Sequence, residues 1–161
     1  MSGSRGNQTG LDPDSSLAGT LPDGVLGLGT DLCAVSRLDR QLAARDGGVI
    51  ASIFVAAEIA RCSAHHHPAR AFAAVFAAKE AVIKSLARAR GQGTFWLDIE
   101  VGDDAHGRPV VTLQGRLRAH AEGLGVRQIH VSHAHDRDHA VACAIVTGGH
   151  AHQRRSRKPC L

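Results

Sequence analysis

Apolar residues recur at steps of three and four along the segment that begins at Pro68, and this spacing predicts the central helix of the chain. The apolar positions that share one face are Phe72, Val75, Phe76, Ile83 and Leu86. Lys79 falls within this face, while Glu80 and Lys84 lie along its edge. We therefore expect one carboxylate and two ammonium groups to meet where the core borders solvent.

Shorter runs on both sides of this helix predict strands and further helices. Alternating apolar and polar residues predict strands at residues 25–30, 95–101, 109–113, 128–132 and 139–147. Helical spacing predicts helices at residues 34–45, 55–62 and 114–122, the first of them ended by Gly47-Gly48. Because helices and strands are mixed and the strands include hairpins, we expect an α+β fold with a small antiparallel or mixed sheet packed on the central helix.

Length and composition predict one domain with a tail at each end. A chain of 161 residues is long enough for one core and not comfortably long enough for two. Residues 1–22 are rich in Gly, Ser, Asp and Thr and predict a disordered leader, residues 23–147 the domain, and residues 148–161 a basic tail. Because aromatic residues make up only 3% and Tyr is absent, we expect a core of Ala, Val, Leu and Ile that oligomerisation would help to stabilise.

The formal net charge of +4 indicates an anionic partner, which the charge alone leaves open among nucleic acid, a phosphorylated small molecule and an acidic protein. A nucleic-acid binder should interleave basic residues with stacking aromatics, and one Trp, four Phe and no Tyr argue against that partner. No apolar run approaches the roughly 20 residues of a membrane span, so we expect no membrane partner. Four cysteines without a C-x-x-C pair predict a reducing, cytoplasmic setting.

The central helix holds two of the three lysines of a chain that has sixteen arginines. This usage suggests that a compact, flexible ammonium group is needed at Lys79 and Lys84. The alternative is that Glu80 and Lys84 form an ordinary helix ion pair, which contributes a few tenths of a kcal/mol, while Lys79 extends out of the core toward solvent. Spacing by itself favours this simpler interpretation.

Two carboxylates that are distant in the sequence are candidates for a metal site. Asp31 follows a predicted strand, and Glu80 lies on the central helix. Mg²⁺ takes one or two protein carboxylates and completes its coordination with water and phosphate oxygens, so this pair suits it. The alternative is that Asp31 caps the helix that follows it.

Histidines and glycines give weaker signals. Cys62 with residues 65–67, and four later histidines with Cys143, superficially resemble zinc ligands, but their spacing is not that of a standard zinc module, and we expect no zinc there. Residues 27–29 and 91–93 are too short for a nucleotide-binding glycine motif and indicate only that backbones approach closely.

Taken in order, several motifs resemble the holo-acyl-carrier-protein synthase family of small 4′-phosphopantetheinyl transferases. Residues 27–37 (GLGTDLCAVSR) and 76–84 (FAAKEAVIK) are similar to its N-terminal and central signatures. Between and beyond them the matching positions are Phe54, Glu58, residues 98–101 (DIEV), Gly107-Arg108-Pro109, Val131-Ser132 and His135. The resemblance covers residues 25–146, and several motifs in the correct order are far more specific than any one alone.

This resemblance implies an enzyme that transfers the phosphopantetheine arm of coenzyme A to a serine of an apo acyl carrier protein and releases adenosine 3′,5′-bisphosphate. It implies that Asp31 and Glu80 hold Mg²⁺, that Lys84 contacts phosphate, and that Glu80 helps to deprotonate the serine, directly or through a metal-bound water. It places His135 and the Gly107-Arg108-Pro109 turn near the nucleotide, and Arg37 against the carrier protein. It also implies a homotrimer with sites at subunit boundaries. The competing hypothesis is a non-catalytic basic oligomer that binds a carrier protein or another anionic partner.

Three positions depart from the family pattern. Val75 stands where the family usually has Arg, Ala34 where it has an acidic residue, and His133 where it has an apolar one. These departures bear on the affinity for coenzyme A and the choice of carrier. None of them touches Asp31, Glu80 or Lys84, so we expect an active enzyme.

Overall fold

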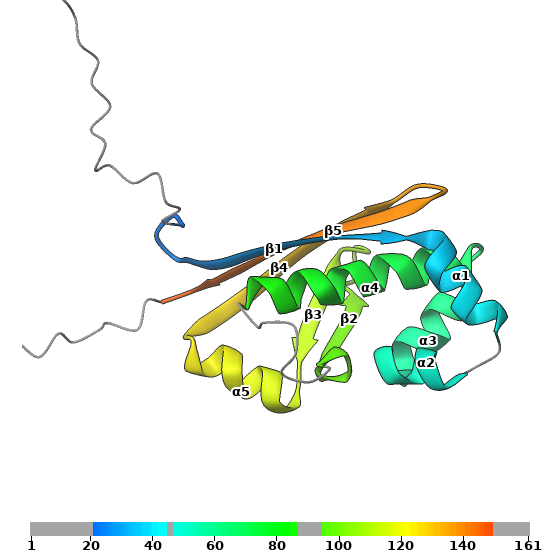
Figure 1. Cartoon of the computed structure of the whole chain (residues 1–161). Helices are drawn as coiled ribbons and strands as arrows, with labels where there is room; N and C mark the ends of the chain where they lie inside the picture. Colours follow the sequence, from blue (N-terminus) through cyan, green and yellow to red (C-terminus); the bar gives the residue numbers. More distant parts are fainter. Residues whose placement is uncertain (1–20, 45–46, 87–94, 150–161) are drawn as a thin grey trace, which may run out of the picture.

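A long helix, α4 (Pro68–Ser85), lies across one face of a three-stranded antiparallel sheet in the computed structural model (Figure 1). The sheet contains β1 (Val25–Ala34), β5 (His139–Gly148) and β4 (Val126–His135), in this order. The structure describes residues 21–44, 47–86 and 95–149. The central helix and the α+β fold predicted from the sequence are confirmed, and the pairing of the strands is antiparallel throughout. The predicted leader, the basic tail and the glycines at 91–93 lie almost wholly outside the described residues.

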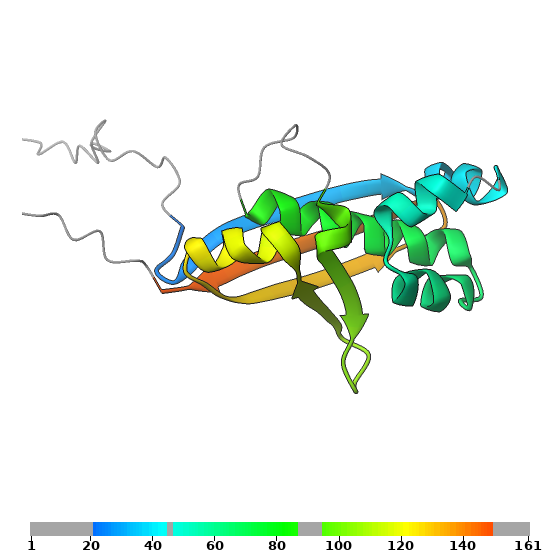
Figure 2. The same ribbon diagram turned by 90° about the horizontal axis from the view of Figure 1, so that it is seen from below.

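The remaining elements surround α4. Three short helices, α1 (Val35–Ala43), α2 (Gly47–Ile53) and α3 (Ala56–Ser63), gather near its first turns, whereas α5 (Gly115–Gly123) lies near its other end (Figure 1). A second, two-stranded sheet pairs β2 (Ile99–Asp103) with β3 (Pro109–Leu113). Figure 2 shows this hairpin projecting from the layers formed by α4 and the larger sheet. None of the helices in the described ranges is long and apolar enough to cross a membrane.

Burial of α4 is more complete than an amphipathic stripe predicts. Every residue from Phe72 to Lys79 is buried, including the alanines on the sides that the sequence pattern left open. The sheet covers one side of the helix, and α1, α3 and β2 cover others. The expected core of small aliphatic residues is present, and all four phenylalanines of the chain also lie in it.

Two glycines of β1 allow α4 to approach the sheet closely. A Cβ atom at Gly27 would lie 1.8 Å from the carbonyl oxygen of Ser85, and one at Gly29 would lie 2.0 Å from that of Ala81. No real Cβ atom tolerates such distances, so any side chain at these positions would push the helix away from the strand. The close backbone approach predicted for residues 27–29 is therefore confirmed.

We expect Gly29→Ala to lower the free energy of unfolding by about 1–3 kcal/mol, because the added methyl group meets rigid backbone rather than a flexible side chain. Gly123→Ala is the matched control, since a Cβ atom at Gly123 meets nothing within 4 Å. The control should change stability by no more than about 0.5 kcal/mol. Urea denaturation of the two variants measures both values, and equal midpoints would show that β1 and α4 can separate at little cost.

Element boundaries differ from the sequence prediction where long-range contacts decide them. The first strand does not end before Asp31 but continues to Ala34, because β1 stays paired with β5 along this whole length. Residues 96–98, expected in a strand, form a short 3₁₀ helix instead. Gly47, expected to lie beyond a helix end, begins α2, where the burial of Ile50 and Ile53 outweighs the low helix propensity of glycine.

Candidate active site

Asp31 and Lys84 form an ion pair between the first strand and the central helix. Lys84 Nζ lies 2.6 Å from Asp31 Oδ1 and donates to the carbonyl oxygen of Thr30 at 2.8 Å. The side chain of Lys84 is 40% exposed and that of Asp31 only 12%. Both alternatives raised for these residues are therefore wrong: Lys84 pairs with Asp31 rather than with Glu80, and the N-cap of α1 is Ala34, with no side-chain cap.

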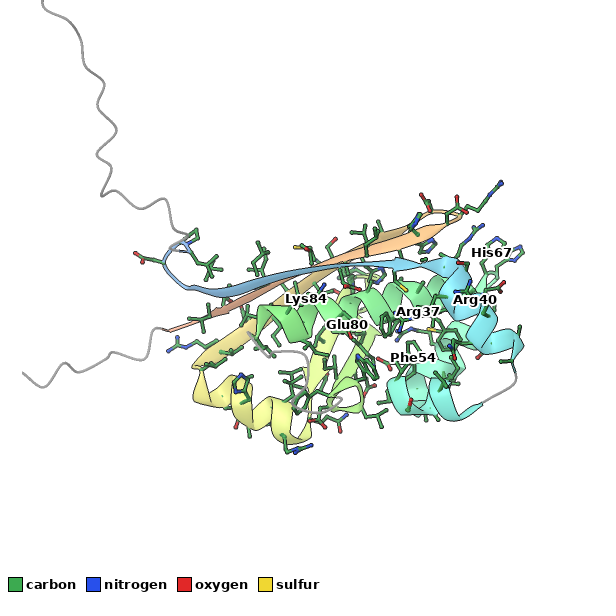
Figure 3. All side chains as sticks on the ribbon, viewed as in Figure 1. Arg37, Arg40, Phe54, His67, Glu80 and Lys84 are labelled. Carbon is green, nitrogen blue, oxygen red and sulfur yellow. The ribbon has the colours of Figure 1, made fainter. Side chains whose placement is uncertain are left out.

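Glu80 lies one helical turn before Lys84 on α4 (Figure 3). Its Oε1 atom accepts a hydrogen bond from the indole nitrogen of Trp96 at 2.7 Å. The side chain is partly buried, and its Oε2 atom has no hydrogen-bond partner among the described residues. One carboxylate oxygen is thus held in place and the other is available.

Both carboxylates act on the same buried thiol. Burial raises the pKa of Cys33, the positive charge of Arg37 lowers it, and the charges of Asp31 and Glu80 raise it further. Cys33 is on β1, on the side of the sheet that α4 covers. Lys84 of α4 contacts Asp31 of β1, and Glu80 lies one turn before Lys84 on the same helix, so the three side chains come from two neighbouring elements.

Lys79 is buried completely and takes no part in this surface site. Its Nζ atom lies 2.7 Å from Glu58 Oε2 and donates to the carbonyl oxygens of Ile53 at 2.9 Å and Trp96 at 2.8 Å. Burial lowers the pKa of Lys79, while the hydrogen bond and charge of Glu58 raise it. The expectation that Lys79 extends toward solvent is therefore wrong, because three fixed acceptors inside the core satisfy its ammonium group.

Glu58 completes this buried pair from α3. Its two oxygens also accept the backbone N–H groups of Val55 and Val101, at 2.9 and 2.8 Å. Every strong acceptor of the carboxylate thus has a donor, as a buried charge requires. The pair connects α3, α4 and the middle of β2.

The predicted carrier-protein contact, Arg37, lies on α1 beside the site (Figure 3). Its guanidinium lies 4.8 Å from the centroid of the Phe76 ring, which is a cation–π distance. Arg40, on the same helix, is also exposed. Two cations of α1 are thus accessible to an anionic partner.

The predicted nucleotide contacts line two other hollows. Gly107 and Arg108 lie in the turn of the β2–β3 hairpin, and Pro109 begins β3. In this turn Asp104 accepts hydrogen bonds from two backbone N–H groups and from Nε of Arg108. Arg108 and Pro109 line a hollow of about 500 Å³ that also includes Arg127. His135 lines a smaller cavity of about 170 Å³. Neither hollow includes Asp31, Glu80 or Lys84, so within one chain these residues are not brought together.

Two departures from the family pattern meet in the smaller cavity. Val75 from α4 and His133 from β4 both line it, next to His135, Arg61 and Asp103. Arg61 is 3.3 Å from Asp103 and donates to the carbonyl oxygen of Val101 at 2.6 Å. Burial lowers the pKa of His133, Asp103 raises it, and the charges of His135 and Arg61 lower it.

This depressed pKa predicts a pH-dependent stability that belongs to His133. The imidazole of His133 binds a proton more tightly in the unfolded chain than in the folded chain. The contribution of His133 to the free energy of unfolding is therefore complete above the unfolded pKa of about 6.5, and it is lost as the pH falls through the lower folded pKa. His133→Val should therefore flatten the decline in unfolding free energy between about pH 7 and pH 5. Chemical denaturation at both pH values measures this, and an equally steep decline in the variant would contradict it.

Within the described residues, no group of three or more His, Cys, Asp or Glu is placed to hold a metal ion. Of the histidines that resemble zinc ligands in sequence, His66 and His67 stack on each other with centroids 4.5 Å apart and are exposed. Cys62 is buried, and this burial raises the pKa of its thiol to about 11. A thiol so far from ionisation is a poor metal ligand.

Comparison with known proteins supports the family resemblance that the motifs indicate. Residues 27–144 match the model of the ACPS family, the 4′-phosphopantetheinyl transferase superfamily. The chain belongs to this superfamily. It is 43% identical over 122 residues to holo-[acyl-carrier-protein] synthase of Moorella thermoacetica, covering 76% of this chain and 94% of that protein. It is 40% identical over 124 residues to that of Syntrophus aciditrophicus, covering 77% and 97%.

Solved structures of the superfamily share the fold. The chain is similar to holo-ACP synthase of Plasmodium yoelii, with a TM-score of 0.66 and 28% identity over 78% of this chain and 96% of that one. It is also similar to the acyl carrier protein synthase of Mycobacterium tuberculosis, with a TM-score of 0.59 and 36% identity over 78% and 99%. The ACPS–CoA complex of Chronobacterium ammoniagenes matches with a TM-score of 0.63 and 28% identity over 76% and 96%. The resemblance inferred from the residues is confirmed, and with it the class of the enzyme.

Proposed function

We propose that this chain transfers the 4′-phosphopantetheine arm of coenzyme A to a serine of an apo acyl carrier protein, depends on Mg²⁺ and releases adenosine 3′,5′-bisphosphate. The observation that carries the proposal is the convergence of Asp31, Glu80 and Lys84 from two elements, at the positions where the chain matches the family signatures. The names of the relatives agree with it, as does the bound coenzyme A of a similar structure.

The two carboxylates fit a magnesium ion. Lys84 donates a hydrogen bond to Oδ1 of Asp31, and Trp96 donates one to Oε1 of Glu80. The second oxygen of each carboxylate can therefore bind a metal ion. Mg²⁺ needs only one or two such ligands when phosphate and water supply the others. When bound, it would neutralise charge on the pyrophosphate and hold its oxygens in line for transfer. Asp31 and Glu80 are the residues that would hold it.

The chain's own groups then account for the remaining steps. The serine oxygen attacks the β-phosphorus of coenzyme A, while Glu80 accepts the serine proton directly or through a water. The bond between that phosphorus and the bridging oxygen breaks, and adenosine 3′,5′-bisphosphate leaves with the electron pair. Lys84, partly exposed and on the same helix face, offsets the charge that develops on the leaving group.

We further propose that the chain assembles as a trimer through the outer face of its large sheet. Leu28 pairs with Ile145 and Leu32 with Val141 across β1 and β5. All four side chains are exposed: Leu28 by 54%, Ile145 by 38%, Leu32 by 65% and Val141 by 47%. So much exposed apolar surface on one sheet face is typical of an interface. A trimer would also allow Gly107, Arg108, Pro109 and His135 of one subunit to reach coenzyme A held by Asp31, Glu80 and Lys84 of another.

Light scattering tests the assembly. Leu32→Asp should dissociate the trimer, whereas Leu97→Asp, at another exposed leucine outside that face, should leave it intact. A trimer that survives the first change would place the interface elsewhere.

The carrier protein is proposed to dock on α1, where Arg37 is accessible and an acidic partner would be attracted by charge. We also propose a reducing, cytoplasmic setting, with which the free thiols of Cys33, Cys62 and Cys143 agree.

The deciding experiment is the intact mass of an apo acyl carrier protein after incubation with this chain, coenzyme A and Mg²⁺. A gain of one phosphopantetheine unit that a chelator abolishes would establish the reaction. No gain with several different carriers would favour the competing hypothesis, a basic oligomer that binds its partner without turnover.

A further inference from the structure

Trp96 is the single tryptophan of the chain, and its side chain ends on Glu80. The indole N–H donates to Glu80 Oε1 at 2.7 Å, and the ring lies against Phe76 with centroids 5.9 Å apart. No motif match singled out this residue. The only signal in the sequence was a lone tryptophan in a chain that is otherwise poor in aromatic residues.

The backbone of Trp96 is held as well. Its carbonyl oxygen accepts a hydrogen bond from Lys79 Nζ at 2.8 Å, and Lys79 is itself fixed by Glu58 at 2.7 Å. Because Lys79 and Glu58 are completely buried, their positions do not depend on solvent or on ligands. Trp96 therefore joins a rigid buried ion pair to a partly exposed carboxylate.

This connection restricts Glu80 in a specific way. A free glutamate side chain on a helix samples several rotamers, and ordering it costs conformational entropy. The indole nitrogen is a donor only, so its bond to a carboxylate is charge-assisted and directional. With Oε1 held in this way, Oε2 is the oxygen left for a metal ion or a proton.

We propose that Trp96 is a positioning residue: by holding Oε1 of Glu80, it presents Oε2 to Mg²⁺ and to the attacking serine. This inference rests on the proposed function, because it assumes that Glu80 is a ligand of Mg²⁺. It adds a second expectation, that the fluorescence of Trp96 reports directly on the metal site, since this indole is hydrogen-bonded to a metal ligand and no other Trp or Tyr emits.

The test compares the wild-type chain with Trp96→Phe, which keeps an aromatic ring at this position and removes the N–H donor together with one ring of the indole. Calorimetric titration with Mg²⁺ in the presence of coenzyme A should show about tenfold weaker Mg²⁺ binding in the variant, the effect of losing one hydrogen bond to a charged group. In the transfer assay the Mg²⁺ concentration for half-maximal rate should rise by a similar factor, while KM for the carrier protein stays unchanged. Leu97→Ala, at the exposed neighbouring residue, is the control and should bind Mg²⁺ as the wild type does.

The outcomes separate this inference from the proposed function. If the wild type transfers phosphopantetheine and Trp96→Phe binds Mg²⁺ with wild-type affinity, the positioning role is overturned and the proposed function stands. If the wild type neither transfers the arm nor binds Mg²⁺, both fail. If Trp96→Phe does not fold, the tryptophan fluorescence of the wild-type chain decides. The emission should change during the Mg²⁺ titration, with the same midpoint as the calorimetric titration. An emission that does not respond to Mg²⁺ overturns the inference.

Discussion

Asp31→Asn and Glu80→Gln are each expected to lower the rate of phosphopantetheine transfer by at least about a hundredfold at fixed Mg²⁺. Each change removes the negative charge of one proposed Mg²⁺ ligand, Asp31 beside Lys84 or Glu80 beside Trp96, and leaves the size of the side chain nearly unchanged. Groups that stabilise developing charge at a reacting centre contribute about 10²–10³ in rate when removed singly. The measurement is the initial rate of mass gain on an apo carrier protein, with Mg²⁺ varied.

Matched controls separate this loss from general effects of charge. Asp23→Asn and Glu122→Gln remove the same charges at exposed positions outside the site and should leave the rate within about twofold. Urea denaturation should show that Glu80→Gln remains folded, because an amide oxygen can still accept the hydrogen bond from Trp96. An Asp31→Asn/Glu80→Gln double variant that keeps its activity would rule out the proposed mechanism.

Of the two lysines of α4, Lys79 should be the more destabilising one to replace. Lys79→Met should lower the unfolding free energy by about 3–5 kcal/mol. The change leaves the carboxylate of Glu58 charged, buried and without its ammonium partner. It also leaves the carbonyl oxygens of Ile53 and Trp96 without their donor. Since a domain of this size is stable by only about 5–15 kcal/mol, urea denaturation will detect the loss easily.

Lys84→Met is the control on the same helix. The ion pair of Lys84 with Asp31 is partly exposed, so its removal should cost no more than about 1 kcal/mol of stability, although it should impair transfer. Adding Glu58→Gln to Lys79→Met should restore part of the lost stability, because the unpaired buried charge disappears. Similar midpoints for Lys79→Met and Lys84→Met would mean that the buried pair contributes little to the folded state.

The contrast between these two lysines shows how far spacing along a helix can be interpreted. The sequence pattern placed Lys79 within the apolar stripe of α4 and Lys84 along its edge, and it predicted that both ammonium groups meet where the core borders solvent. Lys79 can be buried because Glu58 of α3 lies beside it and pairs with its ammonium group. Lys84 pairs with Asp31 because β1 packs against α4 at this point. The partners lie 21 and 53 residues away in the sequence, beyond the reach of any helical period.

Local signals were strong enough where they did not depend on such partners. Pro68 marked the first turn of α4, and the hairpin strand at Pro109–Leu113 has the predicted bounds, because turn residues and alternation define a hairpin locally. The order and spacing of the motifs were sufficient to identify the family, since each motif records a residue type that the chemistry requires. The glycines of β1 were correctly interpreted as points of close backbone approach.

The sequence by itself therefore determined the fold class, the central helix and the family, and it supplied the residues proposed to hold Mg²⁺ and phosphate. The tertiary structure alone decided that Lys79 pairs with Glu58 in the core, that Lys84 pairs with Asp31, that Trp96 holds Glu80, and that Val75 and His133 share one cavity. The physical reason is that propensity and periodicity act over a few neighbouring residues. Burial and hydrogen bonding depend instead on which distant segments pack together, and that is settled only when the whole core forms.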